Sequence, residues 1–208
     1  METNSLLRKA NWVVSASVIL LGAVVAIGSA LFISCEPAKS QQAEQLNFTK
    51  EQLIERGKYL VNTSACHDCH SPKVMTPHGP EPDPERLLSG HPSSSPLPEV
   101  NVSEVKDWIF FNHDLTAIVG PWGASFAANL TSDETGTGNW SEEQFFTAIR
   151  KGKYKGLEGS RDLLPPMPWQ VYRNMTDNDL RAIFAYLQTT KPVRNIVPAP
   201  IAPNDIPQ

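Results

Sequence analysis

The pentapeptide Cys66-His67-Asp68-Cys69-His70 decides how the rest of this 208-residue chain is interpreted. Cys-x-x-Cys-His is the attachment signature of a c-type haem. Two residues between the cysteines place the sulfurs at the separation of the porphyrin vinyl groups, and the adjacent histidine supplies a ligand to iron. The pattern therefore predicts one haem c, bonded covalently to Cys66 and Cys69, with His70 as the proximal iron ligand.

A disulfide, a thiol redox pair and half of a zinc site are the alternative interpretations of the two cysteines. A structural zinc site needs a second pair of ligands at zinc-finger spacing, and no cysteine follows Cys69. A thioredoxin-like pair is expected in a βαβ context, which the flanking sequence does not suggest. The sequence therefore favours haem over these three.

The first 35 residues predict a membrane-targeting segment. Positions 10–35 contain no charged residue, and this run is longer than the ~20 apolar residues that a helix needs to cross a bilayer core. Trp12 lies where an interfacial aromatic residue is expected, and Arg8 and Lys9 precede it. By the positive-inside rule, residues 1–35 form a single transmembrane anchor in a bacterial inner membrane, with the haem domain on the periplasmic side.

Two alternatives to a retained anchor stay open. Gly28-Ser29-Ala30 offers small residues where a signal peptidase could cleave, although the apolar run is long for a signal peptide. Cys35 could carry a lipid, but Ile33 occupies a position of the lipidation motif that prefers a small residue. Each alternative still puts the haem domain on the outer side of the membrane.

The remaining chain is predicted to be a helical haem domain. The same start signal occurs three times: an apolar residue precedes a Thr or Ser N-cap, an acceptor side chain follows the cap by three residues, and an apolar residue comes next. It predicts helices at 50–63, 142–151 and 177–188. A fourth helix is expected at 104–112. Gly57 permits close approach of another helix, for which the last helix is the natural mate. Since no strand-like alternation is evident, we expect a mostly α fold with long loops, preceded by one transmembrane helix.

An electron carrier needs a sixth iron ligand, for which the methionines are the first candidates. Met1 is remote, and Met75 follows His70 too closely to reach the opposite haem face without a very tight loop. Met175 is already explained as the apolar residue before the N-cap of the last helix. These three are therefore weaker ligand candidates than the remaining methionine.

That methionine lies in the segment Leu163-Leu164-Pro165-Pro166-Met167-Pro168-Trp169. Prolines fix φ and make the loop stiff, which suits a thioether whose bond to iron is weak. Met167 is therefore the predicted distal ligand. A purely apolar role for Met167 and bis-histidine ligation by His113 are the alternatives, while His78 and His91 lie in sequence that looks exposed.

The charges are distributed unevenly along the chain. The formal net charge of −4 argues against nucleic acid as a partner. Residues 36–149 carry seven Lys/Arg and sixteen Asp/Glu, whereas residues 150–208 carry nine and five. A basic segment before the Met167 loop is either a docking site for an acidic partner or a solvated helix end, and its Arg161 could instead pair with a haem propionate. The basic segment comprises Arg150, Lys151, Lys153, Lys155 and Arg161.

Several motifs resemble a known family over about residues 50–192. The capped first helix, Cys66–His70, the Pro-Met-Pro loop and the final helix resemble the class I c-type cytochrome fold. Asn129-Leu130-Thr131-Ser132-Asp133, Gly136-x-Gly138-Asn139-Trp140 and Pro166-Met167-Pro168-Trp169 resemble the cytochrome domains of membrane-bound bacterial alcohol and gluconate dehydrogenases. The resemblance implies His/Met ligation and electron transfer, with Trp140 and Asn129 lining the haem pocket. This chain has a single CxxCH where those subunits carry several.

The sequence predicts three segments after the anchor and a function in electron transfer. Residues 36–47 form a polar linker, 48–192 the cytochrome c domain and 193–208 a Pro-rich C-terminal tail. Two strong axial ligands saturate the iron, and methionine raises its potential, so an electron-transfer protein without catalysis of its own is expected. It would serve a respiratory chain as a carrier or as a haem subunit, with a quinol-oxidising complex, a dehydrogenase or a terminal oxidase as redox partner. The alternative is a haem enzyme or sensor, peroxidase-like or gas-binding, with a displaceable sixth ligand.

Overall fold

The computed structural model describes residues 48–207 apart from residue 106. The expected anchor at 1–35 and linker at 36–47 lie outside the described residues. Within 48–105 and 107–207, no helix has the length and apolar character needed to cross a bilayer.

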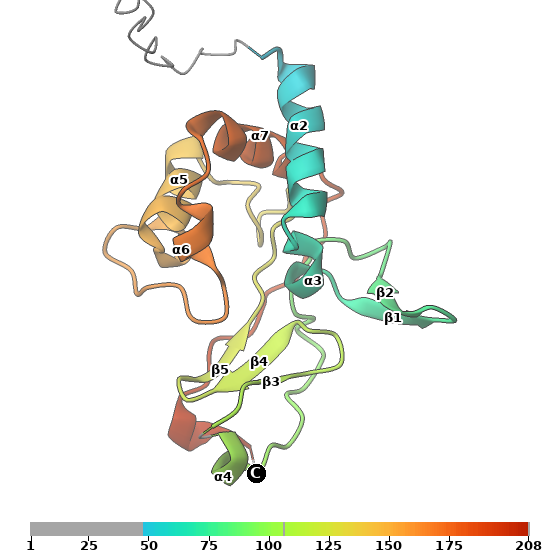
Figure 1. The fold of residues 1–208 in the computed structure, drawn as a ribbon, viewed down its shortest axis with the longest axis vertical. Coiled ribbons are helices and arrows are strands. Elements are labelled where there is room, and N and C mark those ends of the chain that lie inside the picture. The colour runs from blue at the N-terminus through green and yellow to red at the C-terminus, as the bar shows by residue number, and fades with distance from the viewer. Residues whose placement is uncertain (1–47, 106, 208) are drawn as a thin grey trace, which may run out of the picture. The chain divides into compact units, whose positions relative to one another are not determined.

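The prediction of a mostly α fold is wrong, because two antiparallel β-sheets accompany the helices (Figure 1). One sheet is the hairpin β1–β2, and the other has the strand order β3–β4–β5. The helices are α2 (Lys50–Thr63), α3 (Cys66–His70), α4 (Val102–Val105), α5 (Glu142–Lys151), α6 (Trp169–Tyr172) and α7 (Asp177–Leu187), with 3-10 turns at Tyr154–Gly156 and Pro203–Asp205. The strands are β1 (Lys73–Thr76), β2 (Gly79–Pro82), β3 (Phe110–Phe111), β4 (Ala117–Gly120) and β5 (Gly123–Phe126).

The strands lack the sequence pattern that would have revealed them. All four residues of β4 are buried, so no polar residue alternates with an apolar one. The hairpin contains two prolines in β2, which normally argue against a strand. The helix expected at 104–112 is instead the short α4 followed by β3, because Phe110 and Phe111 pair with Val119 and Ile118 of β4.

The expected start signals of the three longer helices are confirmed. Thr49 Oγ1 accepts from the Gln52 amide at 3.3 Å, and Gln52 Oε1 accepts in return from the Thr49 amide at 2.8 Å, which completes a capping box. Ser141 and Thr176 accept from the third helical amide of α5 and α7, each at 3.1 Å. Two helices have the expected bounds, and α7 ends one residue early, at Leu187.

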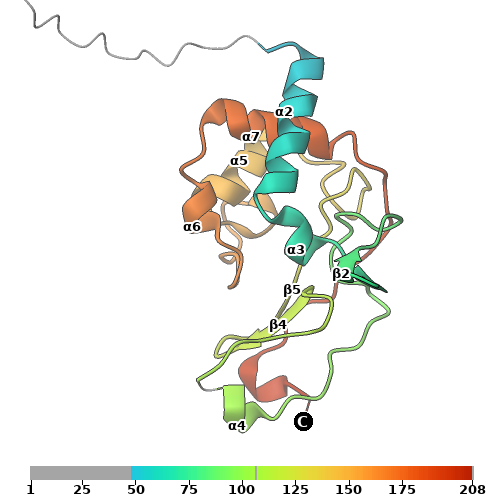
Figure 2. The same cartoon turned by 45° about the vertical axis from the view of Figure 1, so that its right-hand side comes forward.

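The main core lies where α2 packs against α7 (Figure 2). Gly57 is essential to this crossing, because a Cβ there would lie 1.9 Å from the backbone oxygen of Ala182. The expected pairing of the first and last helices through Gly57 is thus confirmed. The buried side chains of this core are Val61, Leu88, Phe145, Ile149, Leu180, Ile183 and Leu187.

A second, smaller core forms between the β3–β4–β5 sheet and the C-terminal segment. Val119 and Ala124 of the sheet pack with Val105 and Ile206. Ile201 exchanges two backbone hydrogen bonds with Ala124, of 2.9 and 3.0 Å. Residues 193–207 are therefore part of the packed domain.

The proline-rich segment 72–100, whose purpose the sequence did not reveal, supports the helix that carries the CxxCH motif. The Leu88 amide donates to Ser71 Oγ at 2.8 Å, and the Gly90 amide donates to the His70 carbonyl at 2.8 Å. His91, expected to be exposed, is completely buried, and its Nδ1 lies 2.8 Å from Thr116 Oγ1. The segment therefore joins α3 to the second sheet.

We expect Gly57→Ala to destabilise the haem-loaded protein by about 1–3 kcal/mol, because the added methyl group forces α2 and α7 apart. Guanidinium denaturation would measure the loss. Gly159→Ala is the matched control, since a Cβ at Gly159 meets no atom within 4 Å. Equal midpoints for the two variants would contradict the close helix crossing.

Candidate haem site

A cavity of about 460 Å³ opens between the two cores, within the ~300–1,000 Å³ typical of cofactor sites. Its lining is mainly apolar, with side chains from α2, α5 and α7 on one side and from β5 on another. All seven residues expected from the sequence at the haem site line this cavity. They are Cys66, Cys69, His70, Asn129, Trp140, Arg161 and Met167.

The geometry of α3 brings the two thiols and the histidine to one face. Ala65 adopts a left-handed conformation with φ of 58°, which interrupts α2 and lets the chain start a new helix at Cys66. In a helix, residues three and four positions apart are neighbours, so Cys69 and His70 lie on the same side as Cys66. Tyr172 fixes this corner, because its hydroxyl donates to the Ser64 carbonyl at 2.6 Å.

His70 is prepared to act as a metal ligand. Its Nδ1 lies 2.7 Å from the Ala128 carbonyl oxygen, which can only accept, so Nδ1 carries a proton. Burial lowers the pKa of His70 and favours the neutral ring. Nε2 is then the unprotonated nitrogen, and a backbone carbonyl holding the other nitrogen is the usual support of a ligating histidine.

The two cysteines are free thiols in the structure, so the disulfide alternative has no support. Burial, assisted by the charge of Asp68, raises the pKa of Cys66 to about 11, and burial also raises the pKa of Cys69. Such thiols are poor spontaneous nucleophiles and poor redox groups. Across the described residues, no group of three or more His, Cys, Asp or Glu side chains is placed to hold a metal ion.

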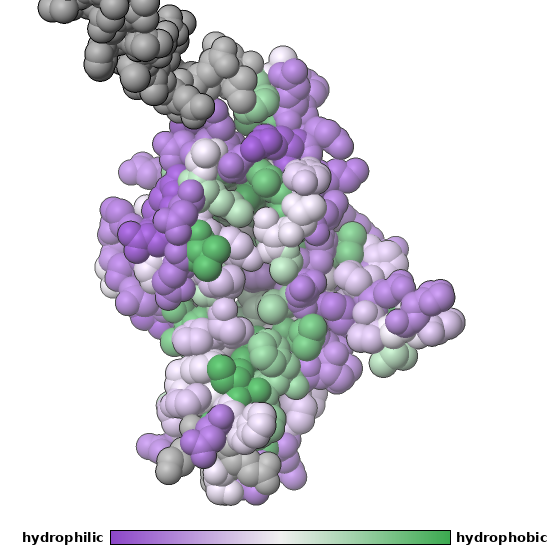
Figure 3. All heavy atoms as spheres, in the orientation of Figure 1, coloured by the Kyte–Doolittle hydropathy of each residue, from purple (hydrophilic) through white to green (hydrophobic). Residues whose placement is uncertain are grey.

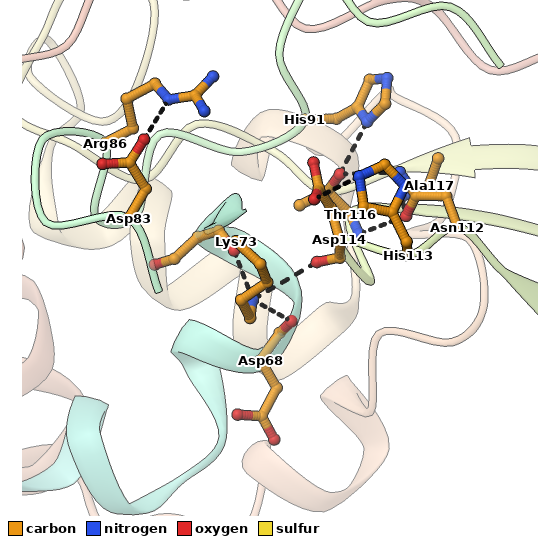
Figure 4. A network of polar contacts seen from close by, with 11 residues as sticks. Asp68, Lys73, Asp83, Arg86, His91, Asn112, His113, Asp114, Thr116 and Ala117 are labelled. Carbon is orange, nitrogen blue, oxygen red and sulfur yellow. Dashed lines mark hydrogen bonds and ion pairs between the residues drawn. The ribbon is translucent and has the colours of Figure 1, made fainter. Parts of the chain in front are cut away.

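Lys73 closes the end of α3, a role that sequence reasoning missed. Its ammonium group is half-buried, and burial lowers its pKa. A cation at the C-terminal end of a helix complements the unpaired carbonyls there. Figure 4 shows this ammonium between α3 and the β3–β4 turn. Its acceptors are the carbonyls of Ser71 at 2.5 Å, Asp68 at 2.9 Å, His67 at 3.0 Å and Asp114 at 3.4 Å.

The methionines separate into two classes. Met167 and Met175 both line the cavity, whereas Met75 on β1 is 77% exposed and does not. Met175 also packs against the main core directly before the Thr176 N-cap, as its position before α7 led us to expect. The cavity therefore offers two thioethers, and both pack against the main core. They differ in position, since Met175 directly precedes the Thr176 N-cap and Met167 lies in the proline-rich loop.

His113 has no place at the cavity. Its side chain is 81% exposed and lies 3.1 Å from Asp114 in the turn between β3 and β4. The bis-histidine alternative is therefore without structural support.

Asn129 lines the cavity, and its side-chain amide organises the surrounding loop. Its Oδ1 accepts from the Thr131 amide and hydroxyl at 2.9 and 2.7 Å. Its Nδ2 donates to Thr135 Oγ1 at 3.0 Å and to the Val193 carbonyl at 2.8 Å. The loop is tight, since a Cβ at Gly138 would lie 2.1 Å from the Ser132 carbonyl oxygen. The Asn-Leu-Thr and Gly-x-Gly motifs thus shape the cavity wall that ends at Trp140.

The basic segment divides into two parts. Three of its five cations form ion pairs at the surface, whereas Lys155 and Arg161 line the cavity and have no ion-pair partner within the described part of the chain. The Arg161 guanidinium stacks 4.0 Å from the centre of the Tyr154 ring. The three pairs are Arg150–Asp177 at 2.6 Å, Lys151–Glu158 at 2.5 Å and Lys153–Asp162 at 2.7 Å.

These residues fit a covalently bound haem. The cavity combines an apolar interior for a porphyrin, a thiol pair at attachment spacing and a histidine with its Nδ1 already engaged. Two cations, Lys155 and Arg161, also line the cavity, and their charges suit the propionate carboxylates of a haem. The structure brings the expected site residues together, and the role of each remains a prediction.

Comparison with known proteins identifies relatives of this chain. The cytochrome c family model matches residues 54–191. The cytochrome subunit of fructose dehydrogenase from Gluconobacter japonicus is 39% identical over 142 residues, which is 67% of this chain and 22% of the relative. The cytochrome c subunit of alcohol dehydrogenase (quinone) from Gluconobacter oxydans is 30% identical over 145 residues, which is 69% of this chain and 23% of the relative. The cytochrome c subunit of gluconate 2-dehydrogenase from Pantoea cypripedii is 28% identical over 137 residues, which is 65% of this chain and 23% of the relative. The matched region therefore spans less than a quarter of these relatives.

We expect haem to remain with the protein after acid–acetone extraction, with the mass increased by one haem. Replacing both thiols, Cys66→Ala with Cys69→Ala, should abolish this adduct because no other described cysteine is available. Intact mass spectrometry measures both results. A covalent haem in the double variant would contradict the assignment of the attachment site.

Proposed function

Because the chain belongs to the cytochrome c family, we propose that it transfers single electrons through one haem c ligated by His70 and Met167. The observation that carries this proposal is that both thiols, His70 and Met167 line one apolar cavity. A haem bound there supplies reversible one-electron chemistry between ferric and ferrous iron. The protein contributes attachment, ligand orientation and exclusion of water.

The protein groups around the cavity have separate tasks under this proposal. The Ala128 carbonyl keeps His70 in the tautomer that leaves Nε2 free and prevents rotation of the ring. The apolar side chains of the main core, such as Leu180 and Ile183, keep water from the iron. With His70 and Met167 both bound to the iron, as proposed, no position would remain for a substrate, and the domain would transfer electrons instead of acting as a peroxidase-like or gas-binding protein.

Lys155 and Arg161 would neutralise the haem propionates. Both line the cavity and lack a carboxylate partner in the described chain, whereas the neighbouring lysines are already paired. A positive charge near the haem favours the reduced state because reduction adds an electron. These two residues would therefore raise the reduction potential of the haem, as a methionine ligand also does.

We infer that the electron donor is a dehydrogenase with which the chain forms a complex. The relatives are cytochrome subunits of fructose, alcohol and gluconate dehydrogenases, which supports such a partner. The surface supports a docked subunit over a freely diffusing carrier, since much of the basic segment is neutralised locally. Figure 3 shows apolar surface gathered over the β3–β4–β5 sheet, and exposed apolar patches are typical of protein contacts. The exposed apolar residues beside β3 are Trp108, Ile109, Phe111 and Leu115.

The domain would operate at the outer face of a bacterial inner membrane. The uncharged apolar stretch at 10–35 and the preceding Arg8 and Lys9 support this location. Haem is normally attached to CxxCH motifs outside the cytoplasm, which supports the same location. Electrons received there could pass to a quinol-oxidising complex or a terminal oxidase.

We expect Met167→Ala to abolish the weak near-infrared band of methionine-to-iron charge transfer, lower the reduction potential and open the ferric iron to cyanide. Optical titration and potentiometry of the haem-loaded protein measure these effects. Met175→Ala is the matched control, because both methionines line the cavity and pack against the main core, whereas only Met167 is the proposed ligand. It should lose stability and keep the band. The reverse pattern would identify Met175 as the ligand.

We expect Arg161→Gln and Lys155→Gln each to lower the reduction potential, by on the order of tens of millivolts, because each removes a positive charge at the cavity. Lys151→Gln is the control, since that ammonium group is paired with Glu158. Potentiometric titration would show whether the two groups differ. Equal potentials in all three variants would argue against propionate pairing.

A further inference from the structure

The loop that carries Met167 has unusually few backbone hydrogen bonds. Three of the residues from Leu164 to Pro168 are prolines, which have no N–H to donate. The Leu163 amide donates to the Gly152 carbonyl at 2.6 Å before the loop, and the Trp169 amide donates to the Met167 carbonyl at 2.9 Å after it. Between these points, something outside the loop must fix the position of its backbone.

Ser125 of β5 is the residue that does so. Its hydroxyl donates to the Pro165 carbonyl at 2.7 Å and accepts from Trp122 Nε1 at 3.3 Å. Within the described chain, this is the one hydrogen bond that reaches the backbone of residues 164–167 from a distant segment. Ser125 is buried and itself lines the cavity.

The strand that carries Ser125 is rigidly held on both edges. β5 pairs with β4 along its length, and on its other edge Ala124 exchanges two hydrogen bonds with Ile201. Three residues after Ser125, the Ala128 carbonyl accepts from His70 Nδ1 at 2.7 Å. One short stretch, 125–128, therefore contains both the carbonyl that contacts the proximal histidine and the hydroxyl that binds the Met167 loop.

We propose that Ser125 is a positioning residue for the methionine ligand, acting through the Pro165 carbonyl. The proposal rests on the proposed function, in which Met167 binds the iron. A bond from thioether to iron is weak, so its occupancy depends on how closely the loop confines the sulfur. The Ser125 hydroxyl reduces the freedom of the loop and strengthens the bond.

A merely structural role makes a different prediction. A buried hydroxyl needs a partner, and Ser125 could satisfy only its own hydrogen-bonding requirement. Loss of the hydroxyl would then lower the stability of the fold and leave the sulfur-to-iron bond unchanged. The affinity of the ferric protein for cyanide separates the two roles, because cyanide binds only when the methionine leaves.

The experiment compares Ser125→Ala with Ser89→Ala in the full-length, haem-loaded protein. Ser89 is another buried serine, and its hydroxyl donates to the Arg86 carbonyl at 2.9 Å, away from the Met167 loop. Cyanide titration, the near-infrared methionine band and guanidinium denaturation are recorded for both variants and for the unaltered chain.

We expect Ser125→Ala to bind cyanide about fivefold more tightly and to show a weaker methionine band, because one hydrogen bond restraining the loop is lost. Ser89→Ala should lose similar stability and match the unaltered chain in both ligand readouts. Unchanged cyanide affinity in Ser125→Ala would overturn the positioning role. A failure of the proposed ligation is distinguishable, since the unaltered chain itself would then lack the methionine band.

Discussion

The hydrogen bond from His70 Nδ1 to the Ala128 carbonyl is the interaction on which the rest of the site depends. It sets the tautomer of His70, the proposed proximal ligand, and connects α3 to the chain that leaves β5. Because Ser125 of the same stretch holds the Pro165 carbonyl, the supports of the two proposed axial ligands are separated by three residues of backbone. The distance between the two sides of the cavity is therefore set locally, although His70 and Met167 are almost a hundred residues apart in sequence.

Features governed by neighbouring residues could be predicted from the sequence, and those governed by distant contacts could not. The N-caps at Thr49, Ser141 and Thr176 each depend on a residue three positions away, so they could be recognised and are confirmed. The strands escape prediction because β4 is buried at every position, β3 has only two residues and β2 contains two prolines. The Pro/Gly surroundings of His91 predict an exposed side chain, but the ring is buried and its two nitrogens contact Thr116 Oγ1 and the Ser95 carbonyl.

The same distinction applies to the site. Spacing alone was enough to predict that Cys66, Cys69 and His70 lie at one site, because α3 determines their geometry locally. Lys73 was missed, since a lysine just after a helix is common, and only the fold shows that Asp114 joins its acceptors from a distant turn. The five cations of the basic segment look alike in sequence. Their separation into paired surface residues and two cavity residues depends on where Glu158, Asp162 and Asp177 fall in the fold.

The C-terminal segment extends this dependence on distant contacts to the environment of the haem. The family model ends at residue 191, yet Ile196, Val197, Pro198 and Pro200 line the cavity. Asn195 fixes the start of this stretch by donating to the Ser89 and His91 carbonyls at 2.7 and 2.9 Å, and pairing with β5 fixes its other end. An apolar stretch held at both ends covers the cavity without needing a helix. Burial of a haem is one of the means by which a protein sets its potential, so these residues beyond the family match would contribute to the potential of a haem bound in the cavity.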